Sequence, residues 1–485
     1  MSSINTYPPF PMPTINYKAA LQLDWIVVGG GISGLATAFV LQKAGHRVRV
    51  LDRLKKLGTP ASGLRVPPNL SKIFKQWFGE EALSKVAVRN VGTPWIDINT
   101  GERIGYHPWK PVVMKETGGD FLMMHHEDVQ KMLYKLATDV GVKVEFGVDV
   151  ASVEAGDPKP RVILANGEVL TADMVVGADG ATSIVRQTAF GIEDDAVQGG
   201  VTLLGGIAPA EEMLKDPVLG KMVLADEWPI FMGTIGACHP VRAKKEFAIQ
   251  LFVPTSEGGP QNDGKESFYE VIPTSAIDIS SYADDVQRLL KMVPYFTRSR
   301  YMKRSKEVTD WMDKSCRIVL IGEAAHPWFP GGSHTTSMVV EDAVVLGTLF
   351  SHLDSWSQVK PFLYAYQEIR EGRTKAVKQE ELTNTILVHL PPGPERDARN
   401  LHMATPATEA DWDDSMLQRE LANFAGIFCY DASDAAEEWW VDWGRYSHRP
   451  SEERERETRL SFLYSSAVVS SESVTAPLTG EGKKQ

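Results

Sequence analysis

The sequence of 485 residues predicts a mixed α/β fold built around a parallel sheet. Three observations support this prediction. A short apolar run, 25–28, leads through a glycine-rich turn into a helix-like segment and a second strand, 47–51. Two later apolar runs, 174–176 and 318–321, also enter a turn with a glycine and an acidic residue before a helix-prone stretch. The chain is about three times as long as an average domain of ~150 residues, so further structural units or an inserted domain are expected.

Composition and charge narrow the class of protein. Hydrophobic residues make up 43% of the chain and charged residues 24%, as in ordinary globular proteins. The balance of 51 Lys and Arg against 63 Asp and Glu gives a net charge of -12. A surface that binds nucleic acid or anionic lipid would need a local basic patch to overcome the repulsion from this net negative charge, and the sequence shows no such patch.

The few cysteines and the termini indicate a cytoplasmic protein. Cys238, Cys316 and Cys429 are widely spaced and odd in number, so neither a disulfide framework nor a Cys-x-x-Cys metal site is expected. Residues 1–21 contain no apolar core of a secretory signal. No stretch approaches the ~18 apolar residues of a membrane-spanning helix. We therefore expect no integral membrane segment.

The first βαβ segment carries a dinucleotide-binding pattern. Gly29, Gly31 and Gly34 form G-x-G-x-x-G directly after the strand, and Gly45 follows the helix as a C-cap. Asp52 closes the second strand, 52 − 34 = 18 residues after the last glycine, where a carboxylate can meet a ribose hydroxyl. Backbone without side chains and the helix N-terminus suit a pyrophosphate. The pattern alone does not distinguish FAD from NAD.

Two further motifs suggest the cofactor. The segment 173–186 contains Asp179-Gly180, and the segment 317–327 contains Gly322-Glu323. In this order, and together with the first motif, they resemble the class A flavoprotein (FAD-dependent) aromatic monooxygenases, the p-hydroxybenzoate hydroxylase-like family. The resemblance extends from about residue 24 to 399, and the segment 390–395 resembles the salicylate hydroxylase-like fungal branch.

The resemblance implies an α/β fold in which an FAD-binding Rossmann-like domain, of p-hydroxybenzoate hydroxylase/glutathione-reductase type, contains an inserted antiparallel β-sheet substrate domain. A helical C-terminal extension follows. The expected boundaries are a flexible arm, 1–20; a discontinuous FAD-binding domain, 21–85, 118–192 and 301–395; a substrate domain, 86–117 and 193–300; the helical extension, 396–448; and a charged, Ser-rich tail, 449–485.

The same resemblance implies FAD as bound cofactor, with O2 and transiently docked NADPH or NADH, since no second G-x-G-x-x-G follows another strand. The predicted cofactor-binding residues are Gly29, Gly31, Gly34, Asp52, Arg53, Gly63, Arg65, His126, Asp179, Gly322, Glu323, Gly332, Thr335 and Thr336. For Arg65, contact with flavin, contact with a substrate carboxylate and an ordinary surface role all remain open.

Four positions depart from the family pattern. Glu323 stands where an Asp is usual, and His126 stands where an Arg usually faces the FAD phosphates. His334 replaces a Gln in the flavin loop, and His239 stands where many members carry a Tyr. FAD binding is expected to survive these changes, whereas the family's substrate contacts do not transfer.

The expected reaction is hydroxylation of a phenolic substrate through a flavin C4a-hydroperoxide, with oxidative decarboxylation of a substituted hydroxybenzoate as a subclass. The catalytic candidates are Pro330, in a loop suited to the flavin, and His239 and His334, because histidine can activate a phenol near neutral pH. A capping turn for Pro330 and a core histidine for His239 are the alternatives. The substrate candidates are Trp228, Phe231 and Met232.

Two rival functions and several partner predictions complete the expectations. The same flavin chemistry can hydroxylate, epoxidise or dearomatise a non-benzoate secondary metabolite, and the departures at His126, Glu323 and His334 leave a non-catalytic flavin-binding protein as an alternative.

No metal is predicted, because residues 125–128 fit a charged helix N-terminus. The aromatic residues near 430–443 are assigned to a packed helix, and the chain is expected as a monomer or homodimer.

Overall fold

The computed structural model describes residue 10 and residues 17–58, 62–156, 158–233, 236–256, 270–329, 331–404 and 414–446. Three predictions fall outside these residues: most of the N-terminal arm, the tail 449–485 and the catalytic candidate Pro330. The chain divides into two compact units, Met1–Ala436 and Glu437–Gln485. The sheets and cavities described below belong to the first unit.

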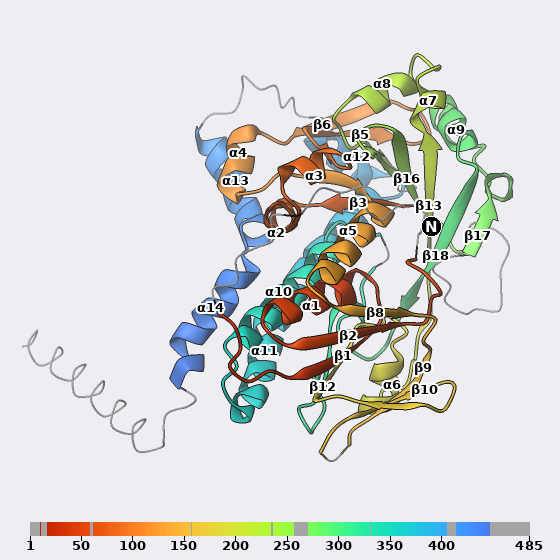
Figure 1. Cartoon of the computed structure of the whole chain (residues 1–485). Helices are drawn as coiled ribbons and strands as arrows, with labels where there is room; N and C mark the ends of the chain where they lie inside the picture. The colour runs from red at the N-terminus through yellow and green to blue at the C-terminus, as the bar shows by residue number, and fades with distance from the viewer. Residues whose placement is uncertain are drawn as a thin grey trace, which may run out of the picture. The chain divides into compact units, whose positions relative to one another are not determined.

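A five-stranded parallel sheet occupies the lower part of Figure 1. The apolar, buried runs of three of its strands, 25–28, 174–176 and 318–320, are expected because both faces of such a sheet are covered. The order in space is β19 (Ile318–Leu320), β12 (Met174–Gly177), β1 (Asp24–Val28), β2 (Arg47–Asp52) and β8 (Lys143–Phe146). The three strands that precede sequence motifs, β1, β12 and β19, are neighbours, so their carboxyl ends meet at one edge.

Helices α1 (Ile32–Lys43), α5 (His126–Asp139) and α10 (Thr335–Ser351) pack beside this sheet, with α1 in contact with both of the others. Gly347 of α10 allows a close approach, since a Cβ there would lie 2.6 Å from the Cβ of Val40 in α1. The long helix α11 (Val359–Val388) packs on α10. Because α1 follows the loop after β1, and α10 follows the loop after β19, the packing of these helices fixes where the two loops end.

The second large sheet has eight strands and lies toward the upper right of Figure 1. All neighbouring pairs are antiparallel except β14 with β5. In order, its strands are β17 (Glu270–Pro273), β18 (Tyr295–Lys303), β13 (Val197–Pro209), β16 (Glu246–Pro254), β15 (Gly236–Val241), β14 (Ile230–Met232), β5 (Gly92–Asp97) and β6 (Arg103–Pro108).

The two faces of this sheet differ, because successive side chains of a strand point to opposite sides. Leu204, Ile249 and Phe296 point into an apolar core that also contains residues of the short helices α7 (Ala210–Met213), α8 (Leu219–Leu224) and α9 (Asp284–Lys291). Their neighbours Gln250 and Thr297 point to the cavity described below. One face therefore packs into the apolar core, and the other face borders the cavity.

Smaller elements complete the described chain. A three-stranded sheet, β3 (Gly63–Val66), β7 (Leu122–His125) and β4 (Val88–Arg89), and a second one, β9 (Val150–Glu154), β10 (Arg161–Leu164) and β11 (Val169–Thr171), accompany the large sheets. The remaining α-helices are α2 (Pro68–Phe78), α3 (Glu80–Ser84), α4 (Pro111–Thr117), α6 (Ile184–Phe190), α12 (Pro394–Met403), α13 (Asp414–Phe428) and α14 (Ala432–Asp442).

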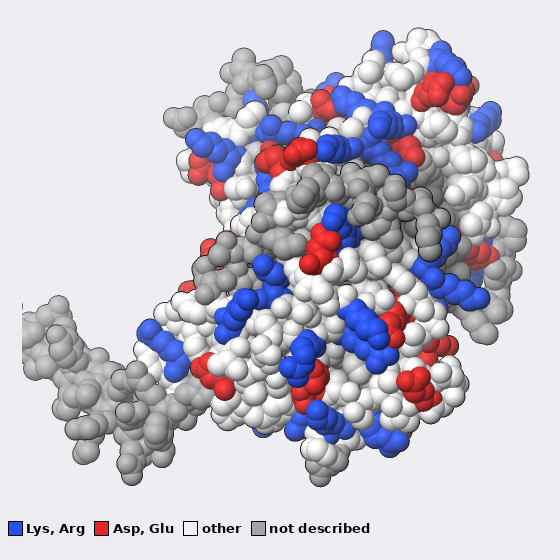
Figure 2. Space-filling view, in the orientation of Figure 1, with Lys and Arg blue, Asp and Glu red and all other residues white. Residues whose placement is uncertain are grey.

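This architecture confirms the predicted fold class: a parallel α/β sheet, an inserted largely antiparallel sheet, and helices at the C-terminal end. On the face shown in Figure 2, basic and acidic side chains are interspersed. None of the helices in the described ranges is both long enough and apolar enough to cross a bilayer.

Candidate active site

All three sequence motifs line one cavity of about 670 Å³, which also reaches the inner face of the eight-stranded sheet. The predicted cofactor-binding residues on its wall are Gly29, Gly31, Asp52, Arg53, Gly63, Arg65, His126, Asp179, Glu323, Gly332, Thr335 and Thr336. The carboxyl ends of β1 and β12 and the N-terminus of α10 contribute, as expected for a ligand crevice in an α/β fold.

The glycines of the first motif have separate tasks. A Cβ on Gly31 would meet no atom within 4 Å, and this residue lies on the cavity wall, so its missing side chain leaves room for a ligand. Gly34 does not line the cavity. A Cβ on Gly34 would lie 1.8 Å from the carbonyl oxygen of Gly29, so this glycine serves the packing of the turn against the helix.

Gly322, the other predicted residue that is absent from the wall, also serves packing. Its φ of +62° lies in the left-handed region, and a Cβ there would lie 2.7 Å from the Oγ of Ser33. Gly322 thus brings the third motif against the first and leaves the next residue, Glu323, on the cavity wall.

Two of the motif carboxylates hold backbone in place. Asp52 accepts hydrogen bonds from the N–H groups of Gly30 (2.6 Å) and Leu54 (2.7 Å), which fixes the glycine turn to the end of β2. Asp179 accepts from the Ser183 hydroxyl (2.5 Å) and from Val185 N–H (3.1 Å) at the start of α6. Burial raises the pKa of Asp179 above its usual value. Both carboxylates also line the cavity.

Polar atoms on the wall fit a ligand rich in hydrogen-bonding groups. In the described part of the chain, five residues that line the cavity have a buried side-chain atom without a hydrogen-bond partner: Ser33 Oγ, Arg65 Nε, His126 Nδ1, Gln130 Oε1 and Thr335 Oγ1. A buried unpaired polar group is costly, so a partner from a bound molecule is expected. With the open space at Gly31, these atoms suit the ribityl, ribose and phosphate groups of FAD.

Arg65 borders the cavity and holds the loop that follows the third motif. Its guanidinium donates to Gln250 Oε1 (2.7 Å) and to the carbonyl oxygen of Gly331. Burial lowers the pKa of Arg65 to about 10, so the group keeps its charge at neutral pH. Of its predicted roles, the surface role is excluded, since Arg65 is only 6% exposed.

Glu381 of α11 holds the same loop from another side, and sequence reasoning missed it. Its carboxylate accepts hydrogen bonds from Trp328 Nε1 and from the backbone N–H groups of Ser333 and His334, the last at 3.3 Å. Burial raises the pKa of Glu381, while the charge of Arg65 opposes that shift. In the sequence, Glu381 is one of many charged residues of a long helix, so no local pattern distinguishes it.

The histidines predicted as catalytic lie behind the cavity wall. His239 of β15 packs against Gly63, where a Cβ would lie 2.5 Å from its Cε1. Burial, helped by the charge of Arg65, lowers the pKa of His239 to about 3. His334 stacks on Phe428 at a centroid distance of 5.9 Å, and burial lowers its pKa to about 3 as well. Both side chains are therefore neutral at physiological pH.

The three predicted substrate residues separate in space. Trp228 packs with Phe121 and Phe428, and its ring lies under the guanidinium of Arg65, 4.8 Å from Cζ to the centroid. Phe231 points to the opposite face of the sheet, into the apolar core. Met232 is fully buried and does not line the cavity. Trp228 lies before β14 (Ile230–Met232), on the side to which Ile230 points, whereas the next residue, Phe231, points to the opposite face because side chains alternate along the strand.

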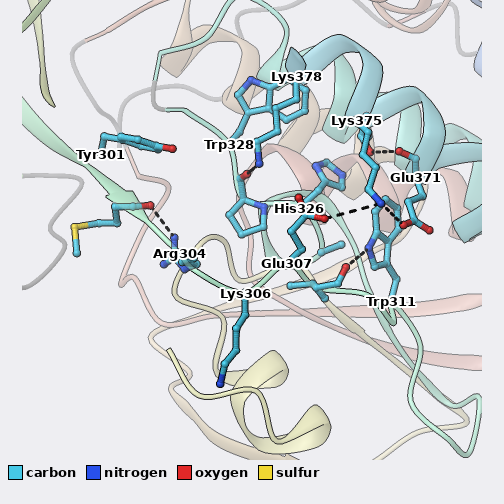
Figure 3. Close-up of a pocket in the computed structure, with 15 residues that line it drawn as sticks. Tyr301, Arg304, Lys306, Glu307, Trp311, His326, Trp328, Glu371, Lys375 and Lys378 are labelled. Carbon is cyan, nitrogen blue, oxygen red and sulfur yellow. Dashed lines mark hydrogen bonds and ion pairs between the residues drawn. The ribbon is translucent and has the colours of Figure 1, made fainter. Parts of the chain in front are cut away.

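A second pocket of about 160 Å³ shares no lining residue with the cavity (Figure 3). Arg304 and Lys306 follow β18, while Lys375 and Lys378 project from α11. Lys375 pairs with Glu371 (2.7 Å), and Lys378 donates to the carbonyl oxygen of Pro327 (2.9 Å). Trp328, on its wall, is the same residue that donates to Glu381, so the pocket adjoins the loop after the third motif.

The class of protein that this fold and cavity suggest, a class A flavoprotein monooxygenase, is shown by comparison with known proteins. A family profile described as "FAD binding domain" matches residues 22–381, and the chain belongs to this family of FAD-dependent aromatic monooxygenases. The chain is 24% identical over 424 residues to FAD-dependent monooxygenase OpS4 of Beauveria bassiana, covering 85% of this chain and 97% of that relative.

Two further comparisons agree. The chain is 25% identical over 365 residues to 3-hydroxybenzoate 6-hydroxylase 1 of Aquipseudomonas alcaligenes, covering 73% of this chain and 86% of the relative. The fold is similar to that of CtdE in complex with FAD and a substrate, with a TM-score of 0.71, 17% identity, and coverage of 88% of this chain and 100% of that one.

Proposed function

We propose that this chain uses NADH or NADPH and O2 to hydroxylate a phenolic aromatic compound, and that a hydroxybenzoate is the substrate class to test first. The observation that carries the proposal is the single cavity that joins all three nucleotide-binding motifs to one face of the inserted sheet. The similarity to 3-hydroxybenzoate 6-hydroxylase 1 supports the substrate class.

Each part of the cavity has a task in this proposal. Gly29 and Gly31 make room for the pyrophosphate at the N-terminus of α1. The carboxylate of Asp52 accepts a hydrogen bond from a ribose hydroxyl, and that of Glu323 accepts one from the ribityl chain. Gly332 and Thr335 lie beside the flavin ring. When bound, FAD takes a hydride from the reductant and transfers one atom of O2 to the substrate.

The protein's own residues position the loop at that ring and exclude water from it. Arg65 and Glu381 hold residues 331–334 through backbone hydrogen bonds, so the approach to the flavin is set by two buried charged groups. Because His239 has a pKa of about 3, lowered mainly by burial, it is a weak proton acceptor at neutral pH. We assign it a hydrogen-bonding role toward the phenol.

We further propose that the phosphates of the reductant dock in the second pocket, where Arg304, Lys306, Lys375 and Lys378 outnumber the carboxylates of Glu307 and Glu371 (Figure 3). Phosphate recognition by such cations is common. Lys306→Glu should raise the KM for NADPH about tenfold and leave that for the aromatic substrate unchanged; an unaltered KM for NADPH would remove this docking site.

The decisive experiment has two stages. Flavin absorbance of the purified full-length protein after addition of FAD tests cofactor binding. Oxidation of NADH and NADPH is then followed with a panel of substituted hydroxybenzoates, and the products are identified by mass spectrometry. Hydroxylated benzoates support the proposal, and CO2 release identifies oxidative decarboxylation. Absence of a flavin spectrum would overturn it, and flavin without substrate-stimulated oxidation would favour a non-catalytic flavin-binding protein.

A second candidate function is hydroxylation, epoxidation or dearomatisation of a non-benzoate secondary metabolite. The similarity to OpS4, whose name specifies no benzoate, favours testing it with the same assay and a wider panel. A cytoplasmic location, as monomer or homodimer, completes the proposal and can be checked by fractionation and gel filtration.

A further inference from the structure

Five aromatic rings form a compact group that we call the aromatic compartment: Trp109, Phe121, Trp228, Phe424 and Phe428. The centroids of Trp109 and Phe121 are 5.0 Å apart, and those of Phe121 and Trp228 are 5.5 Å apart. Phe428 lies 6.1 Å from Phe121 and 5.1 Å from Phe424. The first three rings come from connections next to β6, β7 and β14, and the last two come from α13.

The compartment adjoins the cofactor cavity through two residues. Arg65 lines the cavity and at the same time covers the ring of Trp228. His334 stacks on Phe428 and follows Gly332, which lies on the cavity wall, by two positions. A molecule in the compartment would therefore lie next to the loop that we assign to the flavin ring.

Unsatisfied polar atoms gather at this boundary. Among the described residues, Arg65 Nε, Trp228 Nε1, His334 Nδ1 and both ring nitrogens of His239 are buried without a hydrogen-bond partner. The other three side chains lie close to Arg65: Trp228 by direct contact, and the two histidines within range of its charge. Each such atom costs about 1–3 kcal/mol when it stays unpaired, so an apolar core is a poor explanation for the group.

Helix α13, which also packs against α4 and α2, covers the compartment with side chains near its C-terminal end. Phe424, Ile427 and Phe428 pack against the rings, whereas Asn423 and Ala425 are exposed. This spacing of three and four residues places a single face of a helix on a surface.

Among its described residues, α13 is bonded to α11 near its C-terminal end. Arg373 of α11 donates to the carbonyl oxygens of Gly426 (2.6 Å) and Ile427 (2.7 Å). These bonds add to the packing of Phe424, Ile427 and Phe428 on the compartment.

We propose that α13 is a lid over the substrate and that Phe428 is its specificity-determining residue. In this proposal the ring of a planar aromatic ligand takes the place of the Phe428 ring, and a carboxylate, phenolate or carbonyl oxygen of that ligand accepts hydrogen bonds from Trp228 Nε1 and Arg65 Nε. The proposal rests on the proposed function, and it identifies which part of the molecule selects the substrate.

Binding to the full-length protein tests this inference without turnover. Isothermal titration calorimetry with 2-naphthoate, in the presence and absence of FAD, should show about tenfold tighter binding to Phe428→Ala than to wild type. The variant no longer needs to displace a ring from the compartment. Phe146→Ala, which removes a half-buried ring of β8 that packs on Tyr134, is the matched control and should bind 2-naphthoate as wild type does.

A second variant tests the donor rather than the space. Trp228→Phe keeps an aromatic ring but loses Nε1–H, so it should bind benzoate about tenfold more weakly and naphthalene with unchanged affinity. Unchanged 2-naphthoate binding in Phe428→Ala, or equal losses for benzoate and naphthalene in Trp228→Phe, would overturn the proposal, as would absence of binding in every variant. NADPH oxidation is measured separately, so failure of the proposed function is distinguishable from failure of the lid.

Discussion

The two ends of the active-site region are built in different ways. The cofactor end consists largely of backbone: Gly29, Gly31, Gly332 and the N-termini of helices, all placed by short sequence motifs. The proposed substrate end consists of side chains such as Trp109, Phe121 and Phe428, which come from connections between elements and from α13. The first end is specified by local conformation, and the second by tertiary packing. A substitution should therefore act on cofactor binding or on substrate selection according to the end that it alters.

The largest expected effect is at the cofactor end. Gly31→Val should weaken FAD binding by more than about 1000-fold, or about 4 kcal/mol, because its side chain projects into the cavity rather than into the protein. The fold should be retained, because a side chain at this position meets no other protein atom near its Cβ. Quenching of FAD fluorescence by the apoprotein measures the affinity, and circular dichroism checks the fold.

Gly372→Val is the matched control for this variant, because a Cβ on Gly372 also meets no atom within 4 Å but the residue is exposed on α11, away from the cavity wall. It should retain FAD fully. A normal flavin content in Gly31→Val would show that the pyrophosphate does not approach this turn.

The next effect concerns Glu381, which stands between the two ends. Glu381→Ala removes the acceptor for Trp328, Ser333 and His334 and should lower the free energy of unfolding by about 3 kcal/mol. Glu381→Gln keeps an acceptor and should lose less than half of that. Urea denaturation of the FAD-loaded protein measures both, with the exposed neighbour Glu380→Ala as control. Equal stability of all three variants would show that the loop is held by other contacts.

His239→Ala should act only at the substrate end. FAD binding should remain as in wild type, because His239 does not line the cavity. Substrate-stimulated turnover should fall about tenfold, the effect of one lost hydrogen bond, and not by the 100-fold or more of a lost general base. Steady-state kinetics with flavin content measured in parallel gives the result. Unchanged kinetics would remove His239 from the site, and a loss above 1000-fold would restore it as the base.

The same difference explains how much the sequence could predict. The fold class, the cavity and many residues on its wall follow from G-x-G-x-x-G and the two later turns. A glycine and an acidic residue directly after a buried strand are typical of a nucleotide-binding turn, so these residues can be recognised from the sequence alone. The aromatic stretch predicts Trp228 and Phe231 together, but Trp228 packs in the aromatic compartment while Phe231 points to the other side of the sheet. Gln250, Glu381 and Phe428 carry no local signal, because only the packing of β16, α11 and α13 brings them to the site.

The smallest expected effect is a loss of stability at lower pH, to which a buried histidine at each end contributes. His126 at the cofactor end and His239 at the substrate end are both buried, and burial lowers their pKa values to about 4 and about 3. As the pH falls below the ordinary value of about 6.5, the unfolded chain takes up a proton before the folded one does. Each residue should therefore cost stability as the pH falls from about 6.5 toward its folded pKa, and none above that range.

Between pH 8 and pH 6 this loss should be about 0.8 kcal/mol for each residue. His126→Gln and His239→Gln should each reduce the pH dependence of urea denaturation by that amount, and their effects should add because different elements hold the two side chains. His402→Gln, the same substitution at an exposed position of α12, is the control for the substitution itself. Equal profiles in wild type and both buried variants would mean that these imidazoles are hydrated in the folded protein, and a reduction in His239→Gln alone would show that only the substrate end excludes water.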